Sequence, residues 1–357
     1  MREEHDVPLA GLTTMRVGGP AARLVTAETT DELVDAVREV DDADEPLLVV
    51  SGGSNLVIAD DGFPGTVVRV ATSGVSVESA DLCGGAMVRV AAGVDWDAFV
   101  TQAVAEGWSG VEALSGIPGC AGATPVQNVG AYGQEVAQTI ASVRVYDRDE
   151  QRVRTFANAG CAFTYRHSLF KATSRYVVLD VLFQLATSDL AQPVSYADLA
   201  RQLGVETGER VPLGDAREAV LTQRARRGMV LDPDDHDTWS CGSFFTNPIL
   251  SAAAFERLEA RAVQRLGEGG PKPPRFRDPD GNVKTSAAWL IEHAGFGKGY
   301  AMPGPAALST KHTLAVTNRG AATAEDVVAL AREVRDGVRD AFAVTLVNEP
   351  VLIGLEL

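Results

Sequence analysis

A single hydroxyl group has an unusual setting in the segment SCGSFFTNP, residues 240–248. Ser243 follows a glycine and precedes two phenylalanines, and the nearby proline disfavours a long helix through the segment. The setting raises the question of what a lone proton donor does there, although most serines in such pairs only cap a helix or a turn.

Two glycine-rich segments have the composition of an anion-binding site. SGGSN, residues 51–55, follows an apolar run, and its small residues let backbone amides approach a phosphate. The glycine-rich loop, IPGCAGATPVQNVGAYG at residues 117–133, surrounds Gln127 and Asn128 with glycines. The segments lie about 65 residues apart, so we expect them to hold a dinucleotide along its pyrophosphate, with both amide side chains free to bond a heterocycle edge.

For both segments, a purely structural interpretation without a ligand stays open. SGGSN taken alone is more often an ordinary strand-to-turn connection, and it is not a Rossmann fingerprint because GxGxxG opening a helix is missing. The glycine-rich loop also fits an Ω-loop that packs on itself.

Helices and strands alternate on either side of these segments, which predicts an α/β or α+β fold. Thr29 and Glu32 predict a capped helix over 29–40, and apolar spacing predicts a second helix over 95–107. Residues 111–133 are too rich in glycine and proline for regular structure. Strands are expected at 46–50, 66–70, 87–93, 142–147, 152–156, 176–185 and 313–318, and further helices at 215–227, 251–267, 286–296 and 323–342.

The length of 357 residues exceeds what one compact core usually holds, so two or three domains are expected, with a boundary near Gly228. Hydrophobic residues make up 45% and charged residues 22%, as in ordinary folded proteins. The net charge of −16 argues against nonspecific binding to nucleic acid or to an anionic membrane. The chain start has no signal-peptide pattern and no apolar run is long enough to span a bilayer, so we expect a cytoplasmic protein.

The cysteines give no sign of a metal site or of disulfides. Cys83, Cys120, Cys161 and Cys241 are far apart, with no CxxC and no histidine at ligand spacing. We expect reduced, mostly buried thiols and no bound metal.

Further motifs follow the glycine-rich loop in a recognisable order: FTYRHSLFK at 163–171, CGSFFTNP at 241–248 and NEPVLIG at 348–354. Together these motifs resemble the UDP-N-acetylenolpyruvoylglucosamine reductase family over nearly the whole chain. The resemblance implies an α+β fold with an FAD-binding region of the vanillyl-alcohol oxidase (PCMH) type and a C-terminal α+β substrate-binding domain. The implied ranges are 1–72 and 73–228 for the two FAD-binding subdomains and 229–342 for the substrate-binding domain, with the terminal strand in 343–357 returning to the first subdomain.

The resemblance also implies a two-step reaction. NADPH reduces a noncovalent FAD, and flavin N5 then passes hydride to UDP-N-acetylglucosamine-enolpyruvate, which becomes UDP-N-acetylmuramate for peptidoglycan synthesis. Ser243 matches the family's proton donor, and Arg166 matches the arginine that engages the enolpyruvyl carboxylate. Glu349 matches a second acidic partner that polarises the intermediate together with the arginine.

Other site residues are carried over from the same motifs. Arg227 stands where relatives usually carry lysine, which alters the geometry of a diphosphate contact rather than removing it. Tyr196 and the insert at 284–304 resemble the larger family type, whose tyrosine loop folds over substrate as a lid. The substrate-binding residues implied are Tyr196, Arg227, Asn247, Lys311 and His312. The cofactor-binding residues implied are Ser51, Gly52, Gly53, Ser54, Asn55, Pro118, Gly119, Cys120, Gly122, Ala123, Thr124, Gln127, Asn128, Gly130, Ala131, Tyr132 and Arg166.

Two different functions compete with this interpretation. One is a flavin-dependent oxidase of the same fold superfamily, but such enzymes often carry a flavin-linking histidine and SGGSN has none. The other is a noncatalytic flavin- or nucleotide-sugar-binding homologue, against which the intact Ser243, Arg166 and Glu349 count. Partners are expected to be small molecules only, and the chain is expected to be a monomer.

Overall fold

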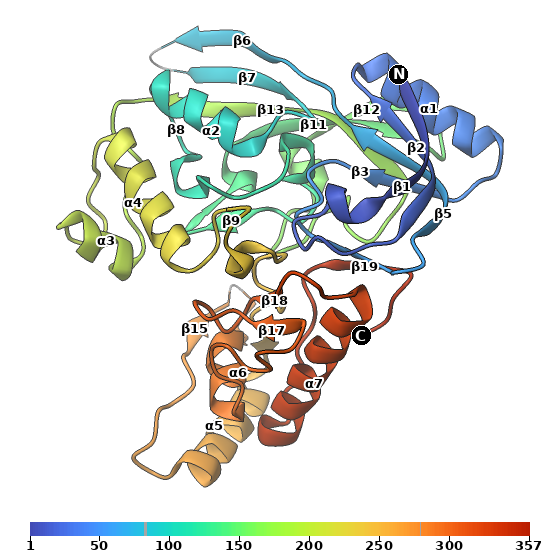
Figure 1. Ribbon diagram of the computed structural model, residues 1–357. Coiled ribbons are helices and arrows are strands. Elements are labelled where there is room, and N and C mark those ends of the chain that lie inside the picture. The colour runs from blue at the N-terminus through green and yellow to red at the C-terminus, as the bar shows by residue number, and fades with distance from the viewer. Residues whose placement is uncertain (82–83, 279) are drawn as a thin grey trace. The chain divides into compact units, whose positions relative to one another are not determined.

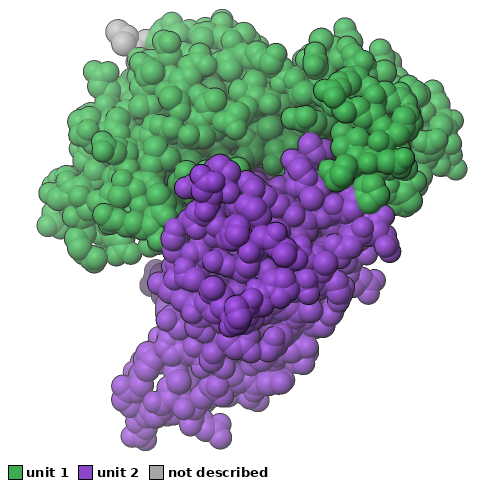
Figure 2. Space-filling model, viewed as in Figure 1, with its two compact units in different colours: residues 1–8, 20–53, 63–231 green, residues 9–19, 54–62, 232–357 purple. Residues whose placement is uncertain are grey.

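The structure is a computed structural model that describes residues 1–81, 84–278 and 280–357. The chain forms two compact units, coloured separately in Figure 2. Unit 1 contains residues 1–8, 20–53 and 63–231, and unit 2 contains residues 9–19, 54–62 and 232–357. Two short N-terminal segments thus belong to the unit that is otherwise built from the C-terminal third of the chain.

The first sheet of unit 1 combines one antiparallel pair with parallel neighbours. Its strand order is β1-β2-β5-β3, with bounds Arg2–Pro8, Pro20–Ala27, Phe63–Val70 and Leu47–Val50. Strands β2 and β3 both run parallel to β5, and helix α1 (Thr30–Asp42) connects them in sequence. The helix begins where the sequence predicts, because the Thr29 side chain accepts a hydrogen bond from the backbone N–H of Glu32 at 3.2 Å.

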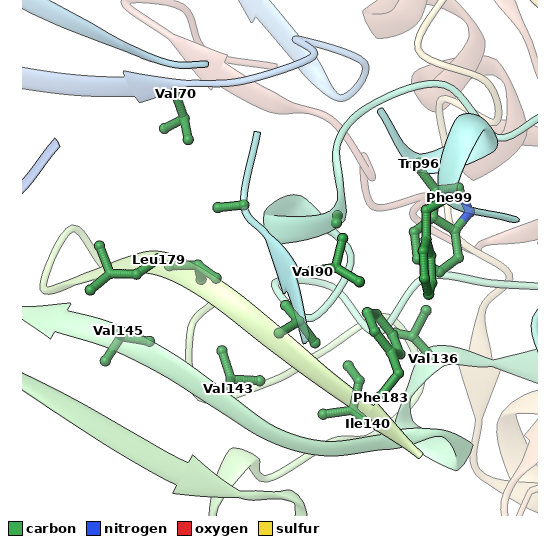
Figure 3. Close-up of a cluster of buried hydrophobic side chains, with 14 of the residues drawn as sticks. Val70, Val90, Trp96, Phe99, Val136, Ile140, Val143, Val145, Leu179 and Phe183 are labelled. Carbon is green, nitrogen blue, oxygen red and sulfur yellow. The ribbon is translucent and has the colours of Figure 1, made fainter. Parts of the chain in front are cut away.

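The second sheet of unit 1 is antiparallel (Figure 1). Its order is β12-β11-β13-β7-β6, and β8 also pairs with β13; the bounds are Arg152–Ala157, Ile140–Asp147, Tyr176–Thr187, Gly85–Ala91, Val75–Asp81 and Trp108–Ser109. Helix α2 (Trp96–Ala105) buries Trp96 and Phe99 against Phe183 of β13, with ring centroids 5.2 to 5.8 Å apart (Figure 3). This cluster is part of a core that also includes valines of the first sheet.

The segment between α2 and β11 contains only short elements, as its glycine and proline content predicts. They are η2 (Glu112–Leu114), η3 (Ala121–Ala123), β9 (Gly130–Ala131), β10 (Gln134–Glu135) and η4 (Val136–Gln138). After β12 comes η5 (Asn158–Cys161), and unit 1 ends with helices α3 (Ala197–Leu203) and α4 (Leu213–Arg226).

Unit 2 packs three helices around small sheets. The helices are α5 (Ala252–Leu266), α6 (Ala287–Ala294) and α7 (Ala324–Phe342), and short turns form η1 (Leu9–Leu12) and η6 (His236–Thr238). Strand β19 (Val351–Ile353) runs parallel to β4 (Leu56–Ile58), which is why the segment 54–62 belongs to this unit. The other strands are β14 (Ile249–Leu250), β16 (Val283–Lys284), β15 (Phe276–Arg277), β17 (Ala306–Leu308) and β18 (Val316–Asn318).

Helix α7 has both the N-terminal cap and the apolar face that its sequence predicts. Thr323 and Asp326 form a reciprocal capping box, and the apolar face of the helix is buried. Across the described ranges, helices long and apolar enough to cross a membrane do not occur. The expected boundaries at residues 72, 228 and 342 stay predictions.

Candidate active site

The two glycine-rich segments meet inside unit 1. A Cβ atom added to Gly52 would lie 2.5 Å from Cα of Gly119, so the contact needs glycine at this position. Ser51 and the backbone of Gly52 also hydrogen-bond the Cys120 side chain, although burial still raises the pKa of that thiol. Residues about 65 apart in sequence thus form one glycine-lined cradle.

Asn128 has a different task from the one that the sequence predicts for its side chain. The residue is 1% exposed and has φ 48°, in the left-handed region. Its Nδ2 donates to Oε2 of Glu135 at 2.9 Å and to the carbonyl of Thr164 at 3.0 Å, and its Oδ1 accepts from the N–H of Ala137 at 3.1 Å. All of these bonds are internal, so the amide shapes the loop rather than being free for a heterocycle edge.

Arg166 lies against the glycine-rich loop. Its Nη2 donates to the carbonyl oxygen of Gly130 at 2.9 Å, and its own carbonyl accepts from Nζ of Lys171 at 2.9 Å. The φ angle of Arg166 is 53°, in the left-handed region that non-glycine residues adopt uncommonly. The structure therefore joins two separate predicted motifs, the glycine-rich loop and FTYRHSLFK.

The arginines at the end of α4 differ in their surroundings. Arg226 is exposed, and Nη2 of Arg227 lies 3.6 Å from Oδ2 of Asp198. Arg224 is turned inward, and its Nη2 donates to the carbonyl of Met229 at 2.7 Å. Its Nε is buried and has no hydrogen-bond partner within the described part of the chain.

Burial lowers the pKa of Arg224 to about 10, against the opposing effects of Tyr132 and Asp97. A buried cation without a bonded carboxylate favours an anionic ligand. The sequence shows three arginines at this helix end but does not indicate which of them is buried.

Tyr196 lies just before α3 and is 52% exposed. Its ring meets that of Tyr132 edge-on, with centroids 5.9 Å apart. Burial raises the pKa of Tyr132, which keeps its hydroxyl protonated. The tyrosine of the predicted lid thus contacts the end of the glycine-rich loop.

In unit 2, the segment containing Ser243 is paired with the chain on both sides. The N–H of Phe244 donates to the carbonyl of Leu314 at 2.8 Å, and the N–H of Glu349 donates to the carbonyl of Phe244 at 2.9 Å. The rings of Phe244 and Phe245 are buried. Ser243 therefore directly precedes a residue whose backbone is bonded to both Leu314 and Glu349.

Asn55 also contacts the segment that carries Glu349. Its Nδ2 donates to the Glu349 carbonyl at 3.2 Å, and its own carbonyl accepts from the N–H of Val351 at 2.9 Å. Ser54 and Asn55 belong to unit 2, whereas Ser51 to Gly53 belong to unit 1. The last residues of SGGSN thus support an element that the sequence places in another motif.

Other predicted substrate residues have structural partners in unit 2. Oδ1 of Asn247 accepts from the N–H of Ala287 at 3.0 Å, at the start of α6. Lys311 forms an ion pair with Asp235, and the N–H of His312 donates to Oγ of Ser309 at 3.2 Å. These contacts hold each backbone and side chain in place.

The remaining cysteines are packing residues. The Cys241 thiol is buried against the carbonyl of Leu56, with Sγ to O at 3.4 Å, and burial raises its pKa to about 12. Burial also raises the pKa of Cys161, to about 11. Cys83 lies outside the described residues. Where the structure describes the chain, no three His, Cys, Asp or Glu side chains are grouped to hold a metal ion.

Two observations fit a bound dinucleotide. The contact of Gly52 with Gly119 brings the two glycine-rich segments together, and small residues of this kind are typical of loops that bind phosphate through backbone amides. The buried Nε of Arg224 lacks a partner among the described residues, which suits a negative group nearby.

Comparisons with known proteins agree with these features. Residues 21–155 match the family described as an FAD binding domain, and residues 232–353 match the C-terminal domain of UDP-N-acetylenolpyruvoylglucosamine reductase. The match to both confirms the predicted fold class, an FAD-binding region followed by a C-terminal substrate-binding domain.

Curated relatives match along the whole chain. The UDP-N-acetylenolpyruvoylglucosamine reductase of Streptomyces avermitilis is 58% identical, over 100% of this chain and 96% of the relative. That of Thermobifida fusca is also 58% identical, over 99% of this chain and 98% of the relative. The crystal structure of the Thermus caldophilus enzyme is 27% identical with a TM-score of 0.65, and the match covers 99% of each chain. The chain therefore belongs to the UDP-N-acetylenolpyruvoylglucosamine reductase family, a family of FAD-containing oxidoreductases.

Proposed function

We propose that this chain reduces UDP-N-acetylglucosamine-enolpyruvate to UDP-N-acetylmuramate, with NADPH as co-substrate, in the synthesis of peptidoglycan precursors. Family membership supports the reaction class, and the described contacts of the predicted residues support their individual roles. Net addition of a hydride and a proton across the enolpyruvyl double bond balances the reaction.

The cofactor is held by the cradle of unit 1 in this proposal. Ser51, Gly52 and Gly119 approach the pyrophosphate through their backbone, and the rest of the glycine-rich loop surrounds the cofactor. When bound, FAD supplies the hydride that adds to the terminal vinyl carbon of the substrate.

Arg166 binds the enolpyruvyl carboxylate in this mechanism. Its guanidinium is planar and always charged, so it stabilises the negative charge that develops as the double bond is reduced. The bond from Nη2 to the Gly130 carbonyl fixes the orientation of the fork before substrate arrives.

Ser243 donates the proton that completes the reduction. The hydroxyl proton goes to the substrate carbon next to the carboxylate, and the alkoxide that remains is reprotonated from solvent before the next turnover. The buried Phe244 and Phe245 keep bulk water from this segment, and Glu349 polarises the carboxylate together with Arg166.

Tyr196, Arg227, Asn247, Lys311 and His312 bind the UDP-sugar in this proposal. Arg227 offers two parallel N–H donors to a diphosphate where a lysine would offer a point charge. Its only described ion-pair distance, 3.6 Å to Asp198, is long, so the guanidinium exchanges that partner for a phosphate at little cost.

The pairing of Glu349 with Phe244 is the observation that carries the proposal, because it joins the predicted proton donor's segment to the predicted acidic residue's segment. The test is stopped-flow absorbance of the purified protein in two half-reactions. NADPH should bleach the flavin, and the enolpyruvyl substrate should restore its absorbance with formation of UDP-N-acetylmuramate. A protein that cannot bind FAD, or a reduced flavin that reacts rapidly with oxygen to give peroxide and ignores the substrate, contradicts the proposal.

The expectations of a cytoplasmic location, a monomeric state and no nucleic-acid or membrane partner stay predictions from the sequence. Preference for NADPH over NADH belongs to the proposal and is measured in the first half-reaction.

A further inference from the structure

A single buried carboxylate joins the segment before Tyr196 to the end of the glycine-rich loop. Glu112 begins η2 and is 1% exposed. Its Oε1 accepts from Nε2 of Gln134 at 2.9 Å and from the backbone N–H of Gln192 at 2.6 Å. Its Oε2 accepts from the backbone N–H of Gly110 at 2.6 Å. All of these residues belong to unit 1.

The chemistry of this carboxylate is unusual for a core position. A buried carboxylate is costly unless charge or hydrogen bonds compensate it. Among the residues that the structure describes, Glu112 has no Lys or Arg in an ion pair, and its three bonded donors are neutral N–H groups. An apolar residue would fill the same space at lower cost, so the carboxylate is better explained by the elements it connects.

Further contacts extend this connection on both sides. The side-chain oxygen of Gln134 accepts from the N–H of Ala113 at 2.8 Å, which ties β10 to η2. Nε2 of Gln192 donates to Oγ of Ser109 at 3.1 Å, which ties the other side to β8. Glu112 therefore lies at the centre of a small polar network.

The tyrosine segment, residues 190–196, also touches the glycine-rich loop directly. A Cβ atom added to Gly133, whose φ is 89°, would lie 2.8 Å from Cβ of Ser195. The Tyr132 and Tyr196 rings meet edge-on at 5.9 Å. The segment is thus held at two points, at Gln192 by the carboxylate and at Tyr196 by ring packing.

We propose that Glu112 is a positioning residue that acts through Tyr196. Its carboxylate holds the tyrosine segment against the glycine-rich loop and so sets the position from which Tyr196 meets the substrate diphosphate. This proposal rests on the proposed function, because Tyr196 is a substrate residue only in that reaction.

Glu112→Ala tests the proposal, because it removes both oxygens that accept from Gln134, Gln192 and Gly110. A glutamine would keep both donors to Oε1 and lose only the Gly110 bond. Of the three bonds, only the Gln192 bond reaches the tyrosine segment. We expect KM for the enolpyruvyl substrate to rise about tenfold, the size of effect that one lost buried bond produces, while kcat changes much less. Gln184→Ala, on β13 and outside this network, is the matched control; its Nε2 donates to the Gly84 carbonyl at 3.4 Å, and its KM should stay close to wild type.

Hydrogen exchange measured on the FAD-loaded protein gives a second readout. In Glu112→Ala, the Gln192 amide and its neighbours in the tyrosine segment should exchange about tenfold faster, while β13 keeps its wild-type protection. Faster exchange spread evenly over unit 1 would mean general destabilisation and would overturn the proposal.

A double-mutant cycle with Tyr196→Phe decides whether Glu112 acts through Tyr196. The effects on KM should be less than additive, because the second change removes what the first one positions. Additive effects, or an unchanged KM in Glu112→Ala, would overturn the proposal. If Glu112→Ala does not fold, Gln134→Ala removes another donor of the same network and goes through the same cycle.

The two proposals fail separately. Wild-type turnover of the enolpyruvyl substrate, measured in parallel, tests the proposed function, whereas exchange at the Gln192 amide reports on the Glu112 contact whatever the substrate is.

Discussion

The backbone N–H of Glu349 donates a hydrogen bond to the carbonyl oxygen of Phe244 at 2.9 Å. These residues are far apart in sequence, and Phe244 directly follows Ser243. The proposed proton donor and the proposed acidic partner are therefore held on paired segments of unit 2, and the position of one depends on the backbone of the other.

Ser243→Ala should separate the two half-reactions. Flavin reduction by NADPH should stay close to wild type, whereas substrate reduction should fall by about 10²- to 10⁴-fold, because a positioned proton donor is lost. Stopped-flow absorbance measures both steps. Thr246→Val, in the same segment, removes a hydroxyl that only bonds the Val347 carbonyl, and it should leave both rates nearly unchanged. Near-normal substrate reduction in Ser243→Ala would remove this serine from the mechanism.

Asn55→Asp should impair substrate reduction rather than FAD binding. The change keeps the size of the side chain but removes the N–H donor to the Glu349 carbonyl. The segment that carries Glu349 then loses one of its hydrogen bonds. We expect kcat to fall about tenfold, as for the loss of one buried bond, with FAD content unchanged. If the flavin absorbance of the purified variant shows lost FAD while the reloaded enzyme turns over normally, Asn55 is a cofactor residue instead.

Gly52→Ala should destabilise unit 1 and lower its FAD content. The new methyl group would overlap Cα of Gly119, and overpacking of this kind costs about 1–3 kcal/mol. Thermal unfolding and FAD titration measure the two effects. Gly214→Ala is the matched control, because a Cβ atom there meets nothing within 4 Å; this change in the first turn of α4 should be neutral or slightly stabilising. Equal melting temperatures and equal FAD content in Gly52→Ala and Gly214→Ala would contradict the proposal that Gly52 and Gly119 hold the cofactor.

Arg166→Lys should weaken substrate binding and slow substrate reduction. Lysine keeps the charge but loses the planar fork, including the bond that orients it on the Gly130 carbonyl. We expect kcat/KM for the enolpyruvyl substrate to fall about 10²-fold, in the range for loss of one transition-state donor. Arg226→Lys, on the exposed side of α4, should have no measurable effect on the same assay. A wild-type kcat/KM in Arg166→Lys would exclude a forked contact.

Asp147→Asn should lower the free energy of unfolding, because it removes the negative charge of a buried ion pair. Hydrogen bonds from Arg175 hold the pKa of Asp147 well below its ordinary 3.8 against the effect of burial, with Arg154 adding to them. A lowered pKa means that this stabilisation is present above about pH 4 and is lost as the pH falls further. We expect the variant to be less stable than wild type by about 3 kcal/mol at pH 7 in urea unfolding.

The same difference should shrink below pH 3.8, because wild-type Asp147 then begins to bind a proton in the unfolded state. Asp149→Asn is the control, since that side chain is 65% exposed and its distance to Arg175 is 3.3 Å. It should change stability by less than about 1 kcal/mol. A gap between Asp147→Asn and wild type that is constant with pH would contradict the assigned pKa shift.

Local patterns in the sequence were sufficient to predict the α-helices other than α3, but they missed many strands, among them β1, β2 and β6. The helices capped by Thr29 and Thr323 begin where the sequence indicates, because a cap and an apolar period involve only neighbouring residues. The irregular run from 111 to 133 contains only short elements, as its glycines and prolines predict. The predicted role of each site residue came from ordered motifs that resemble a family, and these roles stay predictions.

Side-chain partners across long sequence separations were not predictable in the same way. The sequence does not indicate that the Asn128 amide is used inside the loop, that Asn55 supports Glu349, or that Arg224 rather than Arg226 is buried. The sequence analysis expects the terminal strand to return to residues 1–72 but does not indicate that its partner is β4. Each of these outcomes depends on which distant segment comes to lie beside the residue.

The sequence by itself determined where the capped helices begin, that the run from 111 to 133 is irregular, and which family the motifs resemble, because these depend on neighbouring residues or on their order along the chain. Only the tertiary structure decided that Gly52 meets Gly119, that Glu349 pairs with Phe244, and that Glu112 holds Gln192. A hydrogen bond or a close contact needs two groups within a few ångströms, and that distance is set by the packing of the whole unit.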